Sequence, residues 1–286
     1  MRQNDNNPMR FLGHSTTTLD EIKERVPAVF TASPSPKVSD RYSYVSTINL
    51  LLAFEKLGWF PHSSKQIGTS IYARHVVRLN NPNLGFMSLK DDKVKPQFVI
   101  DNSHNATSPA MGHIGLFRLV CTNGLMVAMP GMNTTIRLRH VGIEFEELKQ
   151  LMEVIANQFV EIGKHITHMQ QYTLNQDQKE NFVMKAIASR EPHLYVKEDS
   201  SIDYLRIKTA VNPITILEPL RSEDKKDDLW TIFNLIQERL VKGQFERRSP
   251  TSKRKSSPRG ITNAVRNIQF NKALWNIAES YLSIAS

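Results

Sequence analysis

Residues Asp101, Asn102, Ser103 and His104 place a carboxylate, a hydroxyl and an imidazole next to one another in the sequence. These three groups serve as acid, nucleophile and base in many hydrolases. Adjacent positions of a strand or turn point in different directions, however, so they rarely converge on one substrate atom. We therefore interpret the stretch as a hydrogen-bonded turn and assign no catalytic residue.

Histidine and cysteine offer little further chemistry. His165 and His168 lie three residues apart in an expected helix, but no third ligand or His-Glu-x-x-His pattern accompanies them, so we expect no metal. Cys121 is the single cysteine and lies in an apolar run, which favours a buried thiol over a nucleophile. The sequence also has no phosphate-binding glycine loop and no Gly-x-Ser-x-Gly motif. We expect neither enzyme activity nor a cofactor.

Positive charge is concentrated near the end of the chain. The 286 residues contain 37 Lys and Arg against 28 Asp and Glu, a net charge of +9. Residues 239–286 alone contain ten basic and two acidic side chains. A localised basic block releases counterions when it meets a polyanion, which predicts contact with nucleic acid. A solvated loop that aids solubility is the alternative.

Two sets of basic residues are predicted to contact DNA. The first lies on expected strands, where arginines suit the binding of a single strand and Tyr72 could stack on a base. Its arginines are Arg74, Arg78, Arg118, Arg137 and Arg139. The second set is predicted to form a mobile capture arm: Lys242, Arg247, Arg248, Lys253, Arg254, Lys255 and Arg259. The strand arginines could instead form the solvated face of an amphipathic sheet. Trp59 could also stack on a base, but we predict that it lies in the core.

Hydrophobic periodicity predicts the elements that position these residues. Period-two or short apolar runs predict strands at 67–79, 97–101, 113–121, 125–128 and 134–141. Helical spacing predicts helices at 18–30, from Ser46 to Gly58, and at 144–171, 176–189, 224–241 and 262–284. Consecutive strands with short turns imply an antiparallel meander. The predicted fold class is α+β, with a long helix on one face of the sheet and a helical C-terminal region.

Three regions are expected along the chain. Residues 1–36 are predicted to be a flexible arm and linker, residues 37–172 a β-β-β-α core, and residues 173–286 a helical region with the basic loop 242–260. No apolar run approaches the roughly 20 residues that span a bilayer. The polar N-terminus has no apolar signal core. We therefore expect a soluble protein of a reducing compartment, without a membrane partner.

Several stretches resemble the phage/plasmid-like family of unknown function. These stretches are Phe117-Arg-Leu-Val-Cys-Thr-Asn-Gly-Leu125, Ile100-Asp-Asn-Ser-His104, Leu217-Glu-Pro-Leu-Arg-Ser-Glu-Asp224, and the segments 228–240, 259–262 and 271–275. The resemblance covers about residues 40–285. Family members often read Asn-Ser-His-Asp-Gly, whereas this chain has Asn105 and Ala106 at the last two positions. That departure puts a carboxylate role at Asn105 in doubt. The resemblance implies a protein carried by phages, prophages or plasmids, and therefore located in the cytoplasm of a bacterial host cell.

A second resemblance concerns the order of elements. A helix that ends in Phe54-Glu-Lys-Leu-Gly-Trp59, followed by a meander and a long helix, is similar to the core of single-strand annealing recombinases of the Erf, RecT and Red-beta types. The resemblance implies rings or filaments that hold single-stranded DNA in a basic groove. Annealing needs no ATP, because base pairing supplies the free energy.

The expected function is therefore DNA binding and single-strand annealing by a homo-oligomer of a mobile element, in homologous recombination. The rival interpretation is a phage or plasmid accessory protein that binds a host defence or restriction factor. A hydrolase with unrecognised carboxylates is a third possibility. Preference for single-stranded over double-stranded oligonucleotides separates the first interpretation from the second.

Overall fold

A computed structural model describes residues 17–84, 87–89, 92–118, 124–126, 135–138, 145–248 and 254–285. The chain forms two compact units. Unit 1 contains residues 1–87, 93–119 and 133–159, and unit 2 contains residues 88–92, 120–132 and 160–286. The long helix α3 (Phe145–Gln171) begins in unit 1 and ends in unit 2. The boundary expected at residue 172 stays a prediction.

Unit 1 opens with short helices whose ends follow from local sequence. The predicted helix 18–30 is two elements, α1 (Leu19–Arg25) and the 3-10 helix η2 (Pro27–Phe30), because Pro27 starts a new turn. Helix α2 (Thr47–Lys56) has the predicted Ser46 cap, whose hydroxyl accepts a hydrogen bond from the Asn49 amide. Gly58 follows with φ of +81°, which favours glycine and ends the helix as expected.

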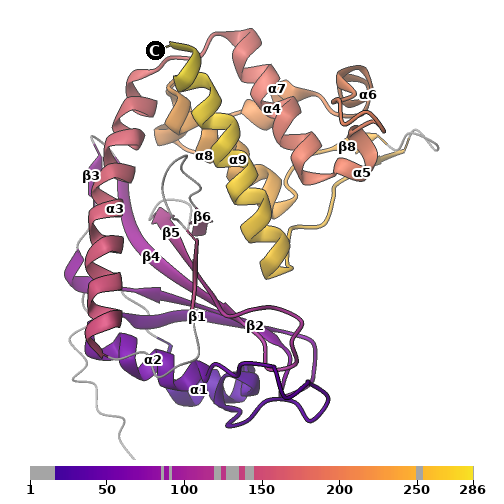
Figure 1. The fold of residues 1–286 in the computed structure, drawn as a ribbon. Coiled ribbons are helices and arrows are strands. Elements are labelled where there is room, and N and C mark those ends of the chain that lie inside the picture. Colours follow the sequence, from indigo (N-terminus) through magenta and orange to yellow (C-terminus); the bar gives the residue numbers. More distant parts are fainter. Residues whose placement is uncertain are drawn as a thin grey trace, which may run out of the picture. The chain divides into compact units, whose positions relative to one another are not determined.

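The strands β1 to β7 form one antiparallel meander, most of which lies in unit 1, and this confirms the predicted fold class (Figure 1). The sheet order is β1-β2-β4-β5-β6, with β3 paired to β4 and β7 paired to β5. The strands are β1 (Phe60–Ile67), β2 (Arg74–Asn80), β3 (Met87–Leu89), β4 (Asp92–Asn102), β5 (Met111–Arg118), β6 (Gly124–Met126) and β7 (Thr135–Arg137). A further 3-10 turn, η3 (Pro82–Leu84), follows β2.

The strand predicted at 67–79 is wrong in its extent. The chain turns at residues 68–73 between β1 and β2, and Gly68 has φ of +104° there. Tyr72 therefore lies in the turn and not on a strand face with Arg74. The sequence analysis missed β1 because this edge strand is half-exposed and has no apolar alternation.

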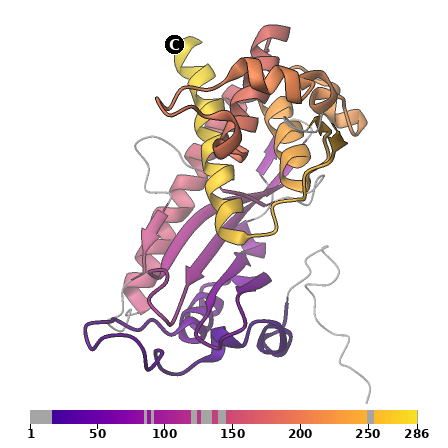
Figure 2. The ribbon, with the colours of Figure 1, turned by 90° about the vertical axis from the view of Figure 1, so that its right-hand side faces the viewer.

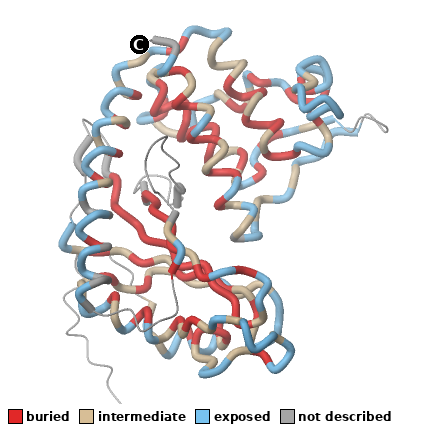
Figure 3. Tube along the Cα trace, viewed as in Figure 1, coloured by how far each residue is buried: buried red, intermediate tan, exposed pale blue. Residues whose placement is uncertain are grey.

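Aromatic packing covers one face of the sheet. Phe98 of β4 contacts Phe54 of α2 at 5.0 Å and Trp59 at 6.3 Å between ring centroids. Phe159 of α3 stacks on Trp59 at 6.3 Å, so α2 and α3 pack on the Phe98 side of the sheet. Trp59 is buried, as predicted. Figure 3 shows that β2 and β4 are mostly buried.

Unit 2 is helical, which confirms the predicted helical C-terminal region. Beyond α3 its helices are α4 (Gln176–Arg190), α5 (Pro192–Tyr195), α6 (Tyr204–Ala210), α7 (Pro213–Leu217), η4 (Ser222–Lys225), α8 (Leu229–Lys242) and α9 (Ala264–Ala285). Helix α9 packs against α4 and α8 (Figures 1 and 2). Trp230, Phe233 and Trp275 form an aromatic core between α8 and α9.

One helix prediction in unit 2 is wrong at its start, and three short helices were missed. Helix α8 begins at Leu229 and not near 224, because the Asp228 carboxylate caps it by accepting from the Thr231 amide. The short helices α5, α6 and α7 were not predicted, since they are too short to repeat a hydrophobic period. Within the described residues, no helix has the length and apolar character needed to cross a membrane.

Candidate nucleic-acid interface

The strand register separates the sheet into an apolar and a polar face. Val77, Leu79, Phe98 and Ile100 share the apolar face. The opposite face, here called the polar sheet face, carries the buried apolar residues Val76 and Val99 together with these polar residues: Ser63, Lys65, Arg74, Arg78, Asn80, Lys95, Gln97, Asp101, His113 and Arg137. Five of these side chains are cations. Asp101 is the single carboxylate among the residues whose register the structure describes.

Asp101 is already neutralised by Arg74. The Arg74 Nε and a terminal nitrogen donate to the two carboxylate oxygens of Asp101, at 2.8 and 2.5 Å. The Asp101 side chain is 3% exposed, and this fork-like pair raises the pKa of Arg74. Arg74, a predicted DNA contact, is therefore committed to a structural ion pair across β2 and β4.

Arg78 lies on the same strand and has no such partner. Its Nε–H is buried and donates no hydrogen bond to any described atom. The residue as a whole is half-buried, and loss of hydration lowers its pKa. Burial also lowers the pKa of Lys95 on β4. Nearby, the Gln97 amide donates to the Asn80 side-chain oxygen at 3.1 Å.

The remaining residues that were predicted to contact DNA from the strands do not lie together on one face. Arg137 is exposed on the polar sheet face, where it pairs in register with Met111. Arg118 pairs with Val94, so the register places it on the opposite face from Arg78. Tyr72 is half-buried in the β1–β2 turn, and Arg139 lies outside the described residues.

Sequence reasoning missed two cations of this face, Lys65 and Lys95. Lys65 was missed because β1 was not recognised as a strand. The sequence could have indicated Lys95, because Lys95, Gln97 and Asp101 occupy alternate positions of β4, with the apolar Pro96, Phe98 and Ile100 between them. The predicted strand 97–101 was too short to include it.

The basic loop 242–260 contains both paired and unpaired cations. Lys242 contacts Glu238 at 2.5 Å, Arg247 contacts Glu191 at 2.6 Å and Lys255 contacts Glu246 at 3.0 Å. The unpaired cations of the loop are Arg248, Arg254 and Arg259. All three side chains are exposed, and no described carboxylate lies within 4.0 Å of them. Lys253 lies outside the described residues. Half of the described arm cations are therefore already neutralised.

The described ends of this loop are held against unit 2. Strands β8 (Arg247–Arg248) and β9 (Lys255–Ser256) pair with each other. Phe245 is buried beneath the Arg190 guanidinium, which lies 5.2 Å from its ring centroid. A terminal nitrogen of Arg190 also donates to the Arg259 carbonyl oxygen at 2.7 Å. The described ends of the loop thus contact the core of unit 2, a feature that the sequence analysis did not predict.

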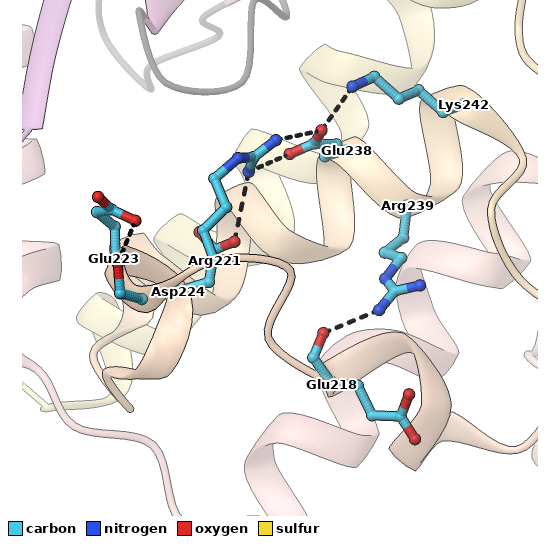
Figure 4. Close-up of polar contacts among 8 residues, drawn as sticks. Glu218, Arg221, Glu223, Asp224, Glu238, Arg239 and Lys242 are labelled. Atoms are coloured by element: carbon cyan, nitrogen blue, oxygen red, sulfur yellow. Dashed lines mark hydrogen bonds and ion pairs between the residues drawn. The ribbon is translucent and has the colours of Figure 1, made fainter.

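Two of the motifs that carry the family resemblance meet in an ion-pair cluster (Figure 4). Arg221 donates two hydrogen bonds of 2.8 Å to the Glu238 carboxylate and lies 3.4 Å from Asp224. Lys242 also donates to Glu238. Burial acts to raise the pKa of Glu238, but the hydrogen bonds and charges of Arg221 and Lys242 outweigh it and lower that pKa. The cluster holds η4 against α8.

The enzyme-like stretch is a buried hydrogen-bonded turn, as predicted. The Asn102 amide donates to the Val45 carbonyl and the Thr47 hydroxyl, both at 2.9 Å. The Ser103 hydroxyl donates to the Ser108 carbonyl at 2.8 Å. These contacts tie the turn to the start of α2 and occupy the side chains of Asn102 and Ser103.

The two histidines of α3 lie beside each other, and one of them lies beside a carboxylate. His165 Nδ1 lies 3.3 Å from a Glu279 carboxylate oxygen, and the His165 and His168 rings are 6.4 Å apart. Among the described residues, no group of three His, Cys, Asp or Glu side chains could hold a metal ion. Cys121 lies outside the described residues.

Comparison with known proteins assigns the chain to a family. Residues 36–275 match the model of a domain of unknown function (DUF932), and the chain belongs to that family. It is 28% identical over 273 residues to the UPF0380 protein YafZ and 27% identical over 273 residues to the UPF0380 protein YfjQ, both of Escherichia coli strain K12. Each alignment covers 93% of this chain and 92% of the relative. No solved structure matches the chain.

Proposed function

We propose that this DUF932 protein binds single-stranded DNA on its polar sheet face and promotes the annealing of complementary strands. One observation supports this most: Arg74 neutralises Asp101, the one carboxylate of that face among the described register positions, while Arg78 and Arg137 have no described carboxylate within 4.0 Å. These two arginines stay protonated near neutral pH. Binding and pairing make or break no covalent bond, so the proposal requires no ATP, cofactor or metal.

We propose that the protein prefers a single strand over a duplex, because single-stranded DNA binds along basic surfaces with stacking side chains. Much of the polar sheet face is buried, and Gln97 and Asp101 are at most 2% exposed. The proposed contacts on this face are therefore the exposed Arg137 and the half-buried Arg78 and Asn80. Tyr72, in the turn at one end of β2, is the proposed stacking residue.

The exposed cations of the basic loop supply a second proposed contact. Arg248, Arg254 and Arg259 would bind phosphates through charge, without reading base sequence. The proposed assembly is a ring or filament of identical subunits in a recombination system of a mobile element. The proposed place of action is the cytoplasm of a bacterial cell.

The test is binding of labelled single-stranded and double-stranded oligonucleotides of equal length at several salt concentrations. We expect tighter binding of the single strand, with a logarithmic affinity that falls as salt rises. Annealing of complementary strands should continue in EDTA and without nucleotide. Lack of binding to either DNA at low salt would refute the proposal and favour the accessory-protein interpretation.

Light scattering tests the assembly. The chain has a mass of 32.7 kDa, and we expect a mass several times larger that grows further with single-stranded DNA. A strict monomer at micromolar concentration, with and without DNA, would contradict annealing by a ring or filament.

A further inference from the structure

Arg78 carries a charge for which the described part of the chain supplies no counterion. Its Nε is buried without a hydrogen bond, and its guanidinium has lost part of its hydration. An arginine cannot escape this cost by losing its proton, because its pKa lies too far above neutral. Proteins therefore pair a dehydrated guanidinium with a carboxylate or with the anion of a ligand.

The neighbouring carboxylate is not available to Arg78. Asp101 lies across from Val76, between the positions of Arg74 and Arg78, on the same face. Both of its oxygens accept hydrogen bonds from Arg74. On β1, the residue opposite Arg78 is Ser63, which has no charge. The fold thus gives Arg74 an internal anion and leaves Arg78 beside it without one.

We propose that Arg78 anchors a built-in binding site for a phosphate group on the polar sheet face. The terminal N–H groups of the guanidinium donate to two phosphate oxygens, an arrangement that matches the fork geometry of arginine. Asn80 lies two residues along the same strand and the same face, where its amide can donate to the ligand. This inference rests on the proposed function, in which the phosphate belongs to a DNA strand.

The first test uses inorganic phosphate as the probe and compares three proteins by thermal unfolding. These are the wild type, Arg78→Gln and Arg137→Gln. The second variant removes one arginine charge from the same face at an exposed position. A ligand that binds the folded state raises the melting temperature. At constant ionic strength, we expect phosphate in place of chloride to stabilise the wild type and Arg137→Gln, and not Arg78→Gln.

Equal stabilisation of all three proteins, or of none, would overturn the proposal. Arg78→Gln breaks no described ion pair, so it should fold, and its circular dichroism spectrum should match the wild type. If it nevertheless fails to fold, Arg78→Lys replaces it. That variant keeps the charge but lacks the two-pronged donor, and it should lose most of the phosphate effect.

The second test measures binding of a single-stranded oligonucleotide by the same variants. We expect Arg78→Gln to weaken binding by about tenfold or more, since hydrogen bonds to charged groups are the strong ones. Arg137→Gln should weaken it by less than about threefold, as loss of an exposed phosphate contact does. Equal losses in the two variants would mean that Arg78 contributes net charge and no site.

The two tests separate this inference from the proposed function. If the protein binds no DNA but phosphate stabilises it through Arg78, the site stands and the DNA function fails. If it binds single-stranded DNA and Arg78→Gln behaves as Arg137→Gln does in both tests, the function stands and the site is refuted.

Discussion

Arginine side chains are paired differently in the two units of the molecule. In unit 2, Arg190 is buried and donates to Glu191, to the Leu240 carbonyl and to the Arg259 carbonyl. Arg221 binds Glu238 through two hydrogen bonds. In unit 1, Arg74 is paired in the same way, whereas Arg78 has a buried nitrogen without a described partner.

The comparison distinguishes an arginine that stabilises the fold from one that can bind a ligand. A guanidinium whose donors are all used by the protein stabilises the fold and has little left to offer. A dehydrated guanidinium without a partner lowers stability until an anion arrives. The predictions below test this distinction, from the largest expected effect to the smallest.

Arg190→Met should have the largest effect. It removes donors from two carbonyl groups and from the buried Glu191 carboxylate. Breaking a buried pair typically costs about 3 to 5 kcal/mol. Urea unfolding should report a loss in this range. A loss below about 1 kcal/mol would mean that the paired arginines of unit 2 are not structural in the sense argued above.

Arg74→Met should cost somewhat less, about 3 kcal/mol, because Arg74 is partly exposed while Asp101 is buried. The double variant Arg74→Met with Asp101→Asn should recover part of that loss, since the orphaned carboxylate is gone. A double-mutant cycle in urea measures the coupling between the two residues.

Glu238→Gln should cost about 2 kcal/mol near pH 7 and make unfolding less dependent on acid. The pKa of Glu238 is lowered in the folded state, so its stabilisation is complete above the unfolded value of about 4.3. That stabilisation is lost as pH falls through the lower folded value. The gap in stability between wild type and variant should therefore narrow below about pH 4. A gap independent of pH would contradict this assignment.

Arg78→Met should leave stability within about 0.5 kcal/mol of the wild type, or raise it, because no described pair is broken. It is the direct counterpart of Arg74→Met, four residues away on the same face. A loss of stability as large as that of Arg74→Met would show that Arg78 has a structural partner and would remove the contrast between the two residues.

Arg254→Gln should have the smallest effect on folding, since Arg254 is exposed and has no described partner. The slope of logarithmic affinity for single-stranded DNA against logarithmic salt should fall by about 0.7 if Arg254 contacts phosphate. Lys255 pairs with Glu246, so Lys255→Gln is the matched control and should change the slope less. Equal slopes for both variants and the wild type would reduce the loop to a solubilising segment.

Local sequence determined much of the fold. The helical period predicted α3, α4 and α9 to within a few residues, because each helix keeps one apolar stripe over several turns. Ser46 and Gly58 marked the ends of α2, because caps act on the nearest backbone groups. The order of strands predicted an antiparallel meander. The edge strand β1 was missed, since its burial depends on neighbours distant in sequence.

The sequence by itself also determined where positive charge gathers along the chain and that Asp101 to His104 form a turn. Only the tertiary structure decided which cations remain available. Lys242, Arg247 and Arg74 form ion pairs with carboxylates, whereas Arg78 forms none with the described residues. Charge is a property of each residue, but neutralisation depends on which strand or helix lies within about 4 Å, and the fold sets that distance.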